Sequence, residues 1–492
     1  MAGARFFELK TVQKVDGLEM VKCISKPCIK SDDEGYNCEW STELTCEEAR
    51  DEYIKAWFLC KILALEYGFG DRDGFVFNIS VGYDLEGIKS EKVNTFINNM
   101  MDAKDTTEFN KCKKYLIDNI NLFKNVKVSD VESISSMISN NVNISTLHGC
   151  PPDEIERIAT YLLTEKKLNT FVKCNPTLLG YDYARNILDN MGYSYIDFTD
   201  NHFKNDLQYN DAVPMFKRLQ DVALKNNLIF GLKLTNTFPV NVTRSELPSN
   251  EMYMSGKPLF LLTMALSDKL AKEFDGNINM SFCGGIDNHN IKDVDEAGLF
   301  PITVATTLLK PGGYGNLLNL AKLTEKENFN ITKVDKDKTD KIVKDILNDE
   351  YYKKSDKKNQ NPPTEKGNIE CKVVCGSCVS VCPNRANVII NIPLINKKYL
   401  VHIDNICNEC GNCAYHCVDK KIPYKDNFTI FKTVDDMKDS TNRGFALISK
   451  VPLKAYVRFC GKEFDYVDGE NTLPKEIVLL IKTIIQDYEY LL

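Results

Sequence analysis

Eight of the eighteen cysteines lie in one short stretch, from Cys371 to Cys417, and form two runs of four. The first run reads Cys-x3-Cys-x2-Cys-x3-Cys-Pro and the second reads Cys-x2-Cys-x2-Cys-x3-Cys. Three closely spaced cysteines on a tight loop can supply three thiolates to a [4Fe–4S] cluster, and a distant cysteine supplies the fourth. The doubled spacing predicts a two-cluster, ferredoxin-like domain over residues 368–425.

The fourth cysteine of each run binds the other cluster in two-cluster ferredoxins. We therefore expect two ligand sets, Cys371, Cys375, Cys378 and Cys417 for one cluster, and Cys382, Cys407, Cys410 and Cys413 for the other. The first set is less regular, because its run opens with three intervening residues and Val418 replaces the usual second proline. Zinc ribbons and a disulfide scaffold are the alternatives. Zinc seldom uses doubled runs of four thiolates, and a cytosolic chain keeps its thiols reduced.

The length and composition limit the function classes. The chain has 492 residues, 43% of them apolar, which suffices for several domains with large cores. Its net charge of −7 leaves no basic surplus for a phosphate backbone, so we expect no nucleic-acid partner. The longest apolar runs, such as 258–266, are far shorter than the roughly 20 residues that span a bilayer. The first residues do not form a signal peptide, so we expect a soluble, cytoplasmic protein without a membrane partner.

Strand-like apolar runs alternate with helical patterns over residues 1–325, which predicts parallel strands joined by helices. Eight such runs favour an α/β fold of the (β/α)8 TIM-barrel type, with an open doubly wound sheet as the alternative. No GxGxxG follows any of them, which argues against a Rossmann nicotinamide site. The expected strands are Phe6–Val12, Phe75–Gly82, Val142–Leu147, Thr170–Asn175, Tyr195–Phe198, Ile229–Asn236, Ile278–Gly284 and Ile302–Leu309. We expect a helix and linker over 326–367, and a small α/β segment over 426–492 that ends in a helix, Pro474–Tyr488.

Active-site groups of such barrels lie at the carboxyl ends of the strands. Gly284 and Gly285 follow the seventh expected strand, and Thr306 and Thr307 lie near the end of the eighth. Backbone N–H groups there can hold the phosphate of flavin mononucleotide, although glycines also simply make turns. A lysine, Lys10, Lys173 or Lys233, can place a cation beside the flavin, and a salt bridge to a barrel carboxylate is the alternative.

Cys150 lies between an expected strand and an expected helix, Asp153–Lys166. The helix N-terminus and nearby His148 favour its thiolate, whereas Asp153 opposes it. A cysteine in this place can exchange a proton with a substrate beside a flavin. The alternative is a buried loop cysteine, which is also our interpretation of the cysteines outside the two runs.

Several of these segments resemble the flavin barrel of dihydroorotate and dihydropyrimidine dehydrogenases. They are Asn143-Ile-Ser-Thr, Lys173-Cys-Asn-Pro, Thr235-Asn236-Thr237, Met254-Ser-Gly-Lys-Pro and Gly284-Gly-Ile-Asp. Two others, Phe77-Asn-Ile-Ser-Val-Gly-Tyr-Asp and Glu39-Trp-Ser-Thr-Glu-Leu, are similar to the bacterial selenate reductase subunit family, over about residues 5–425. Members of that family are long iron–sulfur flavoproteins associated with anaerobic breakdown of purines and related heterocycles.

The resemblance implies roles for individual residues. Lys10 and Lys173 resemble flavin-contacting lysines, with Thr235 beside them, and Cys150 resembles the cysteine that protonates a ring carbon. The side chains that resemble readers of the amide edges of a pyrimidine are Asp84, Asn143, Asn236 and Thr237. The loop before Cys150 is shorter than in dihydropyrimidine dehydrogenase, and Asp84 stands in place of an amide. The resemblance also implies one more strand upstream and a pyridine-nucleotide module downstream, in a longer chain or in a partner. With that extra strand, one of the eight expected strands, for which Tyr195–Phe198 is the candidate, would lie outside the barrel.

We expect an oxidoreductase subunit with two [4Fe–4S] clusters and flavin mononucleotide. A partner NAD(P)H flavoprotein would supply electrons, and a purine- or pyrimidine-like ring would be reduced or oxidised. The alternative is an electron-transfer subunit with no substrate of its own, which serves a molybdenum hydroxylase-type or selenate reductase partner. Bound flavin discriminates between the two, because a barrel without flavin has little means of redox chemistry.

Overall fold

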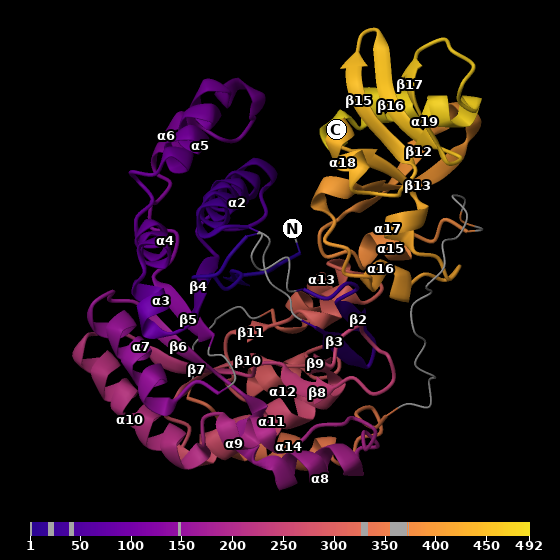
Figure 1. Ribbon diagram of the computed structural model, residues 1–492. Helices are drawn as coiled ribbons and strands as arrows, with labels where there is room; N and C mark the ends of the chain where they lie inside the picture. The colour runs from indigo at the N-terminus through magenta and orange to yellow at the C-terminus, as the bar shows by residue number, and fades with distance from the viewer. Residues whose placement is uncertain are drawn as a thin grey trace.

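The computed structural model describes residues 2–17, 24–38, 44–145, 149–325, 333–354, 371 and 373–492. The strands in this part of the chain form three sheets, of seven, six and four strands. Figure 1 shows the six-stranded sheet at the upper right, apart from the helices that surround the seven-stranded sheet. None of the helices in the described ranges combines the length and apolar character needed to cross a membrane.

The seven-stranded sheet is parallel throughout and has the order β1-β4-β5-β6-β7-β10-β11. Its two edge strands approach each other, because the ring of Phe6 in β1 meets that of Phe300, just before β11, edge-on at 4.9 Å. The sheet is therefore TIM-barrel-like. Its strands are β1 (Phe6–Glu8), β4 (Val76–Gly82), β5 (Asn141–Ser145), β6 (Asn169–Cys174), β7 (Phe230–Leu234), β10 (Asn279–Cys283) and β11 (Ile302–Thr303).

The prediction of eight barrel strands is wrong for the described residues, because Tyr195–Phe198 forms no strand. This segment is apolar for another reason, since Phe198 packs against Phe238 of a separate small sheet with ring centroids 4.8 Å apart. The last expected strand is also shorter than predicted. It ends at Thr303, and a 3-10 turn, η3 (Thr306–Leu309), follows. The expected strand end at 146–147 lies outside the described residues.

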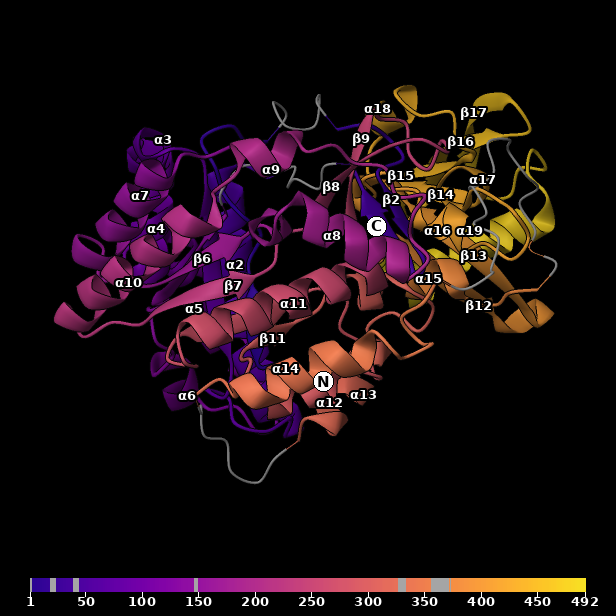
Figure 2. The same cartoon turned by 90° about the horizontal axis from the view of Figure 1, so that it is seen from below.

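Helices surround the parallel sheet (Figures 1 and 2). Helix α11 is buried over most of its surface, because α14 packs on its outer side, where Thr339 donates a hydrogen bond to Asp268. The helix expected before the linker thus belongs to the barrel. The helices and turns are α2 (Cys46–Tyr67), α3 (Leu85–Lys89), α4 (Glu91–Met101), α5 (Thr107–Asp118), η1 (Ile120–Leu122), α6 (Val128–Glu132), α7 (Pro152–Thr164), η2 (Pro176–Leu179), α8 (Tyr181–Asn190), α9 (Asn201–Asn205), α10 (Tyr209–Lys225), α11 (Lys257–Glu273), α12 (Ile291–Glu296), α13 (Gly315–Leu323) and α14 (Lys336–Ile346).

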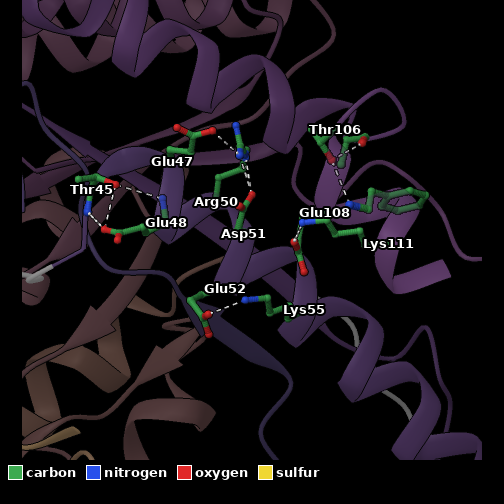
Figure 3. A network of polar contacts seen from close by, with 12 residues as sticks. Thr45, Glu47, Glu48, Arg50, Asp51, Glu52, Lys55, Thr106, Glu108 and Lys111 are labelled. Carbon is green, nitrogen blue, oxygen red and sulfur yellow. Dashed lines mark hydrogen bonds and ion pairs between the residues drawn. The ribbon is translucent and has the colours of Figure 1, made fainter. Parts of the chain in front are cut away.

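Helix α2 shows how local sequence sets an element's start and its orientation. The Thr45 hydroxyl accepts a hydrogen bond from the Glu48 N–H, and the Glu48 carboxylate accepts one from the Thr45 N–H, which forms a capping box. Ion pairs such as Lys55 with Glu52 follow the polar side of the helix (Figure 3). Ile54 and Phe58 are buried on the side toward the core.

A small antiparallel sheet with the order β2-β3-β9-β8 lies at the carboxyl-end face of the barrel. Two of its strands belong to the loop after β1, and the other two belong to the loop after β7. Because these loops leave the carboxyl ends of barrel strands, the sheet covers part of the mouth, the face where barrel sites form. Its strands are β2 (Ile29–Ser31), β3 (Glu34–Asn37), β8 (Phe238–Asn241) and β9 (Glu251–Gly256).

The C-terminal region contains both cysteine runs and the six-stranded sheet β12-β13-β14-β15-β16-β17. The sheet crosses residue 425, where the sequence suggested a boundary, so the cysteine-bearing segment and the C-terminal segment share one sheet. The predicted C-terminal helix is confirmed as α19. The elements are α15 (Ser377–Ser380), β12 (Asn387–Ile392), η4 (Pro393–Ile395), β13 (Lys397–Ile403), η5 (Asp404–Ile406), α16 (Asn412–Tyr415), α17 (Pro423–Asp426), β14 (Phe428–Phe431), α18 (Val434–Lys438), β15 (Gly444–Lys450), β16 (Leu453–Phe459), β17 (Lys462–Val467), α19 (Lys475–Asp487) and η6 (Glu489–Leu491).

Candidate active site and cysteine centres

A buried ion pair lies inside the barrel. Lys233 of β7 is 2% exposed, and its Nζ lies 2.5 Å from a carboxylate oxygen of Glu8 in β1. The same Nζ donates a hydrogen bond to the hydroxyl of Thr303 at 3.2 Å. For Lys233, the structure therefore shows the salt bridge that the sequence left open as the alternative to a flavin contact.

Two lysines act on the Glu8 carboxylate inside the barrel. Burial favours the neutral acid of Glu8, but Lys233, together with Lys173 of β6 and a hydrogen bond from Asn143, outweighs burial and lowers the pKa of Glu8. The pKa of Lys233 is raised, because Glu8 and Cys283 outweigh the effect of its burial. Glu8 is therefore held as the carboxylate between lysines of two barrel strands.

Three loops converge beside this interior, from the ends of β9, β10 and β11. Gly285 has φ +63°, and a Cβ there would lie 2.3 Å from the carbonyl oxygen of Gly256. A Cβ on Gly284 would lie 2.4 Å from the hydroxyl of Thr263 in α11, so close packing requires both glycines. The Thr306 hydroxyl is hydrogen-bonded to that of Ser255 at 2.9 Å.

The hydroxyl groups of the threonines expected at the flavin site already have protein partners. Thr307 donates a hydrogen bond to the carbonyl of Ile286, as Thr306 is paired with Ser255. Thr235 is 2% exposed and is hydrogen-bonded to Thr263, so its hydroxyl serves packing against α11. In position and charge, the loops and Lys173 fit a flavin with a phosphate at η3. The hydroxyls would have to exchange partners, or backbone N–H groups would hold the phosphate.

Cys150 precedes α7 and is partly buried. Burial, with contributions from Glu154, Asp153 and Asp84, raises the pKa of its thiol to about 11. Burial, together with the carboxylates, thus outweighs the helix N-terminus that was expected to favour the thiolate, and His148 lies outside the described residues. A protonated thiol is the form that can act as a general acid.

A buried carboxylate, Asp206, organises the loop before Cys150. It accepts hydrogen bonds from the Gly149 N–H at 2.8 Å, from Asn175 Nδ2 at 3.0 Å and from Thr177 Oγ1 at 2.8 Å. Asn175 in turn accepts a hydrogen bond from Asn236 Nδ2 at 2.8 Å. The structure therefore brings the Cys150 loop and the amide of Asn236 into one network, which is an arrangement suited to reading a planar ring edge.

Other expected substrate readers have different surroundings. Asp84 caps α3, where its carboxylate accepts a hydrogen bond from the Gly87 N–H at 2.7 Å. Asn143 contacts Glu8 inside the barrel rather than the Asp206 network. Lys10 lies just after β1, and its carbonyl accepts a hydrogen bond from Tyr53. Thr237 follows Asn236 and is partly buried.

Sequence reasoning missed Glu8 and Asp206. For Glu8, a signal was present, since a charged residue inside the apolar strand 6–8 needs a partner just as Lys233 does. Asp206 lies after the short helix α9, far from any strand end, and no pattern in the sequence distinguishes it from the surrounding polar residues.

The eight clustered cysteines surround two separate cavities. One cavity is lined by Cys371, Cys375, Cys378 and Cys417, and the other by Cys382, Cys407, Cys410 and Cys413. These are the two sets expected from the sequence, each made of three cysteines from one run and the fourth from the other. We call them the first and the second cysteine cavity.

Backbone N–H groups point at several of these sulfurs. The N–H of Ala386 lies 3.2 Å from Cys382 Sγ, that of Glu409 lies 3.3 Å from Cys407 Sγ, and that of Lys421 lies 3.3 Å from Cys417 Sγ. Burial raises the pKa of Cys378 and of Cys407 to about 12. Buried thiols with such pKa values become thiolates only beside a strong positive charge, and a bound metal supplies one.

The arrangement is unsuited to a single metal ion. Within the described ranges, no three His, Cys, Asp or Glu side chains are grouped closely enough to ligate one ion. Four thiolates on one zinc ion would lie about 3.8 Å apart, given a Zn–S bond of about 2.3 Å. An inorganic cluster, which lies between its four thiolates, is the group that cysteines lining a shared cavity would hold.

The parallel sheet and the helices around it form a TIM-barrel-like α/β domain. The chain belongs to the family of oxidoreductase YgfK, whose N-terminal TIM-barrel domain matches residues 1–354. The YgfK oxidoreductases of Escherichia coli strains K12 and O157:H7 are each 40% identical to it over 410 residues. The match covers 81% of this chain but 39% of each relative, so the chain spans about two fifths of their length.

Two solved structures of Eimeria tenella DHODH also align with the chain. The complex with ferulenol has 15% identity and a TM-score of 0.36, and covers 70% of this chain and 76% of its own. The ligand-free form has 16% identity and a TM-score of 0.34, and covers 69% and 77%. Likeness at this level carries no conclusion about this chain.

Proposed function

We propose that the chain is an iron–sulfur flavin oxidoreductase that reduces or oxidises one C=C or C=N bond of a purine- or pyrimidine-like ring. Its electron partner is an NAD(P)H-dependent flavoprotein, joined through two [4Fe–4S] clusters. The observation that carries the proposal is the grouping of eight cysteines around two cavities beside a barrel whose mouth holds lysine, amide and thiol groups.

When bound, flavin mononucleotide would exchange a hydride with the ring, and the clusters would pass single electrons between the donor and the flavin. Lys173 would hold the isoalloxazine edge by its charge, and the loops at Gly285 and Thr306 would hold the phosphate. The four cysteines of each cavity would hold one cluster.

The chain's own groups complete the reaction. Reduction of one double bond consumes two electrons and two protons. The hydride that bound flavin would supply accounts for both electrons and one proton, and the Cys150 thiol would donate the second proton and recover it from water. The electrons come from reduced pyridine nucleotide, which is oxidised on the partner. Asn236 orients the ring edge, and Asp206 keeps Gly149 and Asn175 in place around it.

The first test is anaerobic purification followed by quantification of iron, sulfide and flavin on one sample. About eight irons with one flavin mononucleotide per chain support the proposal, and justify a screen of purines and pyrimidines. Absence of iron would refute the cluster assignment.

A second function is favoured by a specific observation. The barrel interior is occupied by the Glu8–Lys233 pair, and Thr306 and Thr307 already have protein partners. Such a barrel suits a subunit that relays electrons to a molybdenum hydroxylase-type or selenate reductase partner and has no substrate of its own. About eight irons without flavin would favour this function.

A further inference from the structure

The second cysteine run lies directly against the small sheet at the barrel mouth. The backbone N–H groups of Cys28 and Ile29 donate to the carbonyl of Cys410 at 3.1 and 2.9 Å. At Gly411, where φ is +82°, a Cβ would lie 2.3 Å from Cβ of Pro27. The loop that carries Cys410 is thus in backbone contact with β2.

Asn412, which is fully buried, links three segments through its side chain. Its Nδ2 donates to the carbonyl oxygens of Leu309 and Val381 at 2.8 Å each, and its Oδ1 accepts from the Ser31 hydroxyl at 2.8 Å. Both donors of the amide are therefore used, one toward the barrel and one toward the first cysteine run. No other common residue of similar size offers two donors and an acceptor in this geometry.

The barrel partner of Asn412 belongs to the proposed flavin site. Leu309 ends η3, the turn that begins at Thr306. On the other side, the backbone N–H of Asn412 is hydrogen-bonded to Cys410, one of the proposed cluster ligands. One residue therefore contacts both the second cysteine cavity and the proposed phosphate turn.

The first cysteine cavity has different surroundings. The residues that line it lie between 371 and 427, as do those of the second cavity, so the difference lies in exposure and not in the lining segments. Cys375 is exposed, and Val373 and Val418 beside it are 70% and 77% exposed.

We infer that the second cysteine cavity is the barrel-proximal end of the electron relay, and that Asn412 is the positioning residue that fixes it against η3. This inference rests on the proposed function. Each electron transfer would oxidise the cluster in the second cysteine cavity by one electron and reduce the acceptor at the barrel mouth by one electron. Dithionite serves as the reductant in the experiment.

The test compares Asn412→Asp with Asn408→Asp in the full chain. The first variant keeps the size and the acceptor but loses both donors, so a carboxylate faces two carbonyl oxygens. Asn408 lines the same cavity without any of the interdomain hydrogen bonds described above, so Asn408→Asp is the matched control. Iron content, hydrogen exchange at Cys28 and Ile29, and the rates of cluster and flavin reduction are measured.

We expect Asn412→Asp to retain the iron content of the control. The amides of Cys28 and Ile29 should exchange at least about tenfold faster, as expected from the loss of two buried hydrogen bonds. Flavin reduction should slow by a similar factor, while cluster reduction keeps its rate. Exchange and flavin reduction equal to those of the control would overturn the inference.

A second variant covers the case in which Asn412→Asp loses iron. Ser31→Ala removes a barrel-side partner of Asn412 and leaves every cysteine run intact. Full iron with faster exchange at Cys28 and Ile29 supports the inference, and full iron with unchanged exchange overturns it. A wild-type protein without flavin refutes the proposed function instead, while the exchange result still decides the role of Asn412.

Discussion

The barrel mouth and the two cysteine cavities are built in opposite ways. At the mouth, charged and polar groups are paired with one another, as Glu8 is with Lys233 and Asp206 is with Asn175. In the C-terminal region, eight cysteines converge on two cavities, and burial raises the pKa values of several of their thiols. A region whose groups satisfy one another can fold without a ligand, whereas buried, convergent thiols are stable as thiolates only when they hold a metal.

Iron removal should therefore have the largest effect, and only in one region. We expect anaerobic chelation of iron to abolish slow amide exchange in α15 and α16, because bound metal supplies of order 10 kcal/mol to small metal domains. Amides of β7 in the barrel should keep their protection. Hydrogen exchange by mass spectrometry measures both, and equal protection in α15 and α16 before and after chelation would contradict the comparison.

The next largest effect is expected from Cys413→Ala, which removes one ligand from the second cysteine cavity. Iron should fall from about eight to about four per chain, and electron entry into the barrel should stop. Cys460→Ala is the control, because this exposed cysteine lines neither cavity. A full complement of iron in Cys413→Ala would refute the ligand assignment.

Breaking the Glu8–Lys233 ion pair in the barrel should destabilise the protein less than iron removal does, and should leave the cysteine cavities intact. Glu8→Gln leaves Lys233 buried without its carboxylate, so the free energy of unfolding should fall by about 3 kcal/mol. Glu86→Gln, an exposed carboxylate in α3, is the control. Chemical denaturation measures the difference, and iron content should not change.

The Glu8–Lys233 pair should also make the free energy of unfolding depend on pH. The pKa of Glu8 is lowered in the folded state, so its stabilising contribution is complete above pH 4.5, the ordinary value for glutamate, and is lost as the pH falls through the lowered pKa. The difference between wild type and Glu8→Gln should therefore shrink below pH 4.5. A difference that stays constant down to pH 2 would show that Glu8 acts by packing alone.

A substitution in the network that holds the loop before Cys150 should destabilise the protein less than Glu8→Gln. Asp206→Asn keeps one acceptor but removes the charge that holds Gly149, Asn175 and Thr177, so we expect a loss of about 1–2 kcal/mol. The Gly149 amide should exchange faster, with iron and flavin unchanged. Asp200→Asn, which is exposed in the same segment, is the control. Unchanged exchange at Gly149 would argue against an organising role for Asp206.

Cys150→Ala should have the smallest effect on stability and cofactor content. It should remove turnover at the barrel mouth and leave the two cysteine cavities unchanged. Cys112→Ala is a matched control, since the pKa of this partly buried thiol is also raised to about 11. With Cys150 as the acid, reduction of the ring should lose rate only as the pH approaches 11. Unchanged turnover in Cys150→Ala would refute the acid role.

The sequence predicted the parts of the molecule that depend on local pattern. The spacing of the cysteines predicted the two groups that the structure assembles, because each run is a short loop whose geometry is set by neighbouring residues. Apolar runs predicted most barrel strands to within a few residues, and the expected helix Asp153–Lys166 corresponds to α7.

Features that depend on long-range packing were not predictable in the same way. The apolar residues of Tyr195–Phe198 predict a strand. A segment packed against Phe238 and a strand inside a barrel both require apolar side chains, so the sequence does not distinguish them. No local pattern indicates that Thr306 and Thr307 are hydrogen-bonded to other loops, since their partners, Ser255 and Ile286, come from distant turns of the chain.

The contact between Ser31 and Asn412 joins residues that are 381 positions apart. At about 5–20 residues per second, a ribosome makes β2 roughly 20–80 s before it makes the asparagine that β2 will contact. During that interval the barrel mouth lacks its partner in the C-terminal region. The barrel mouth and the C-terminal region therefore dock only after both have been made, and until then the edge of β2 is open to other chains.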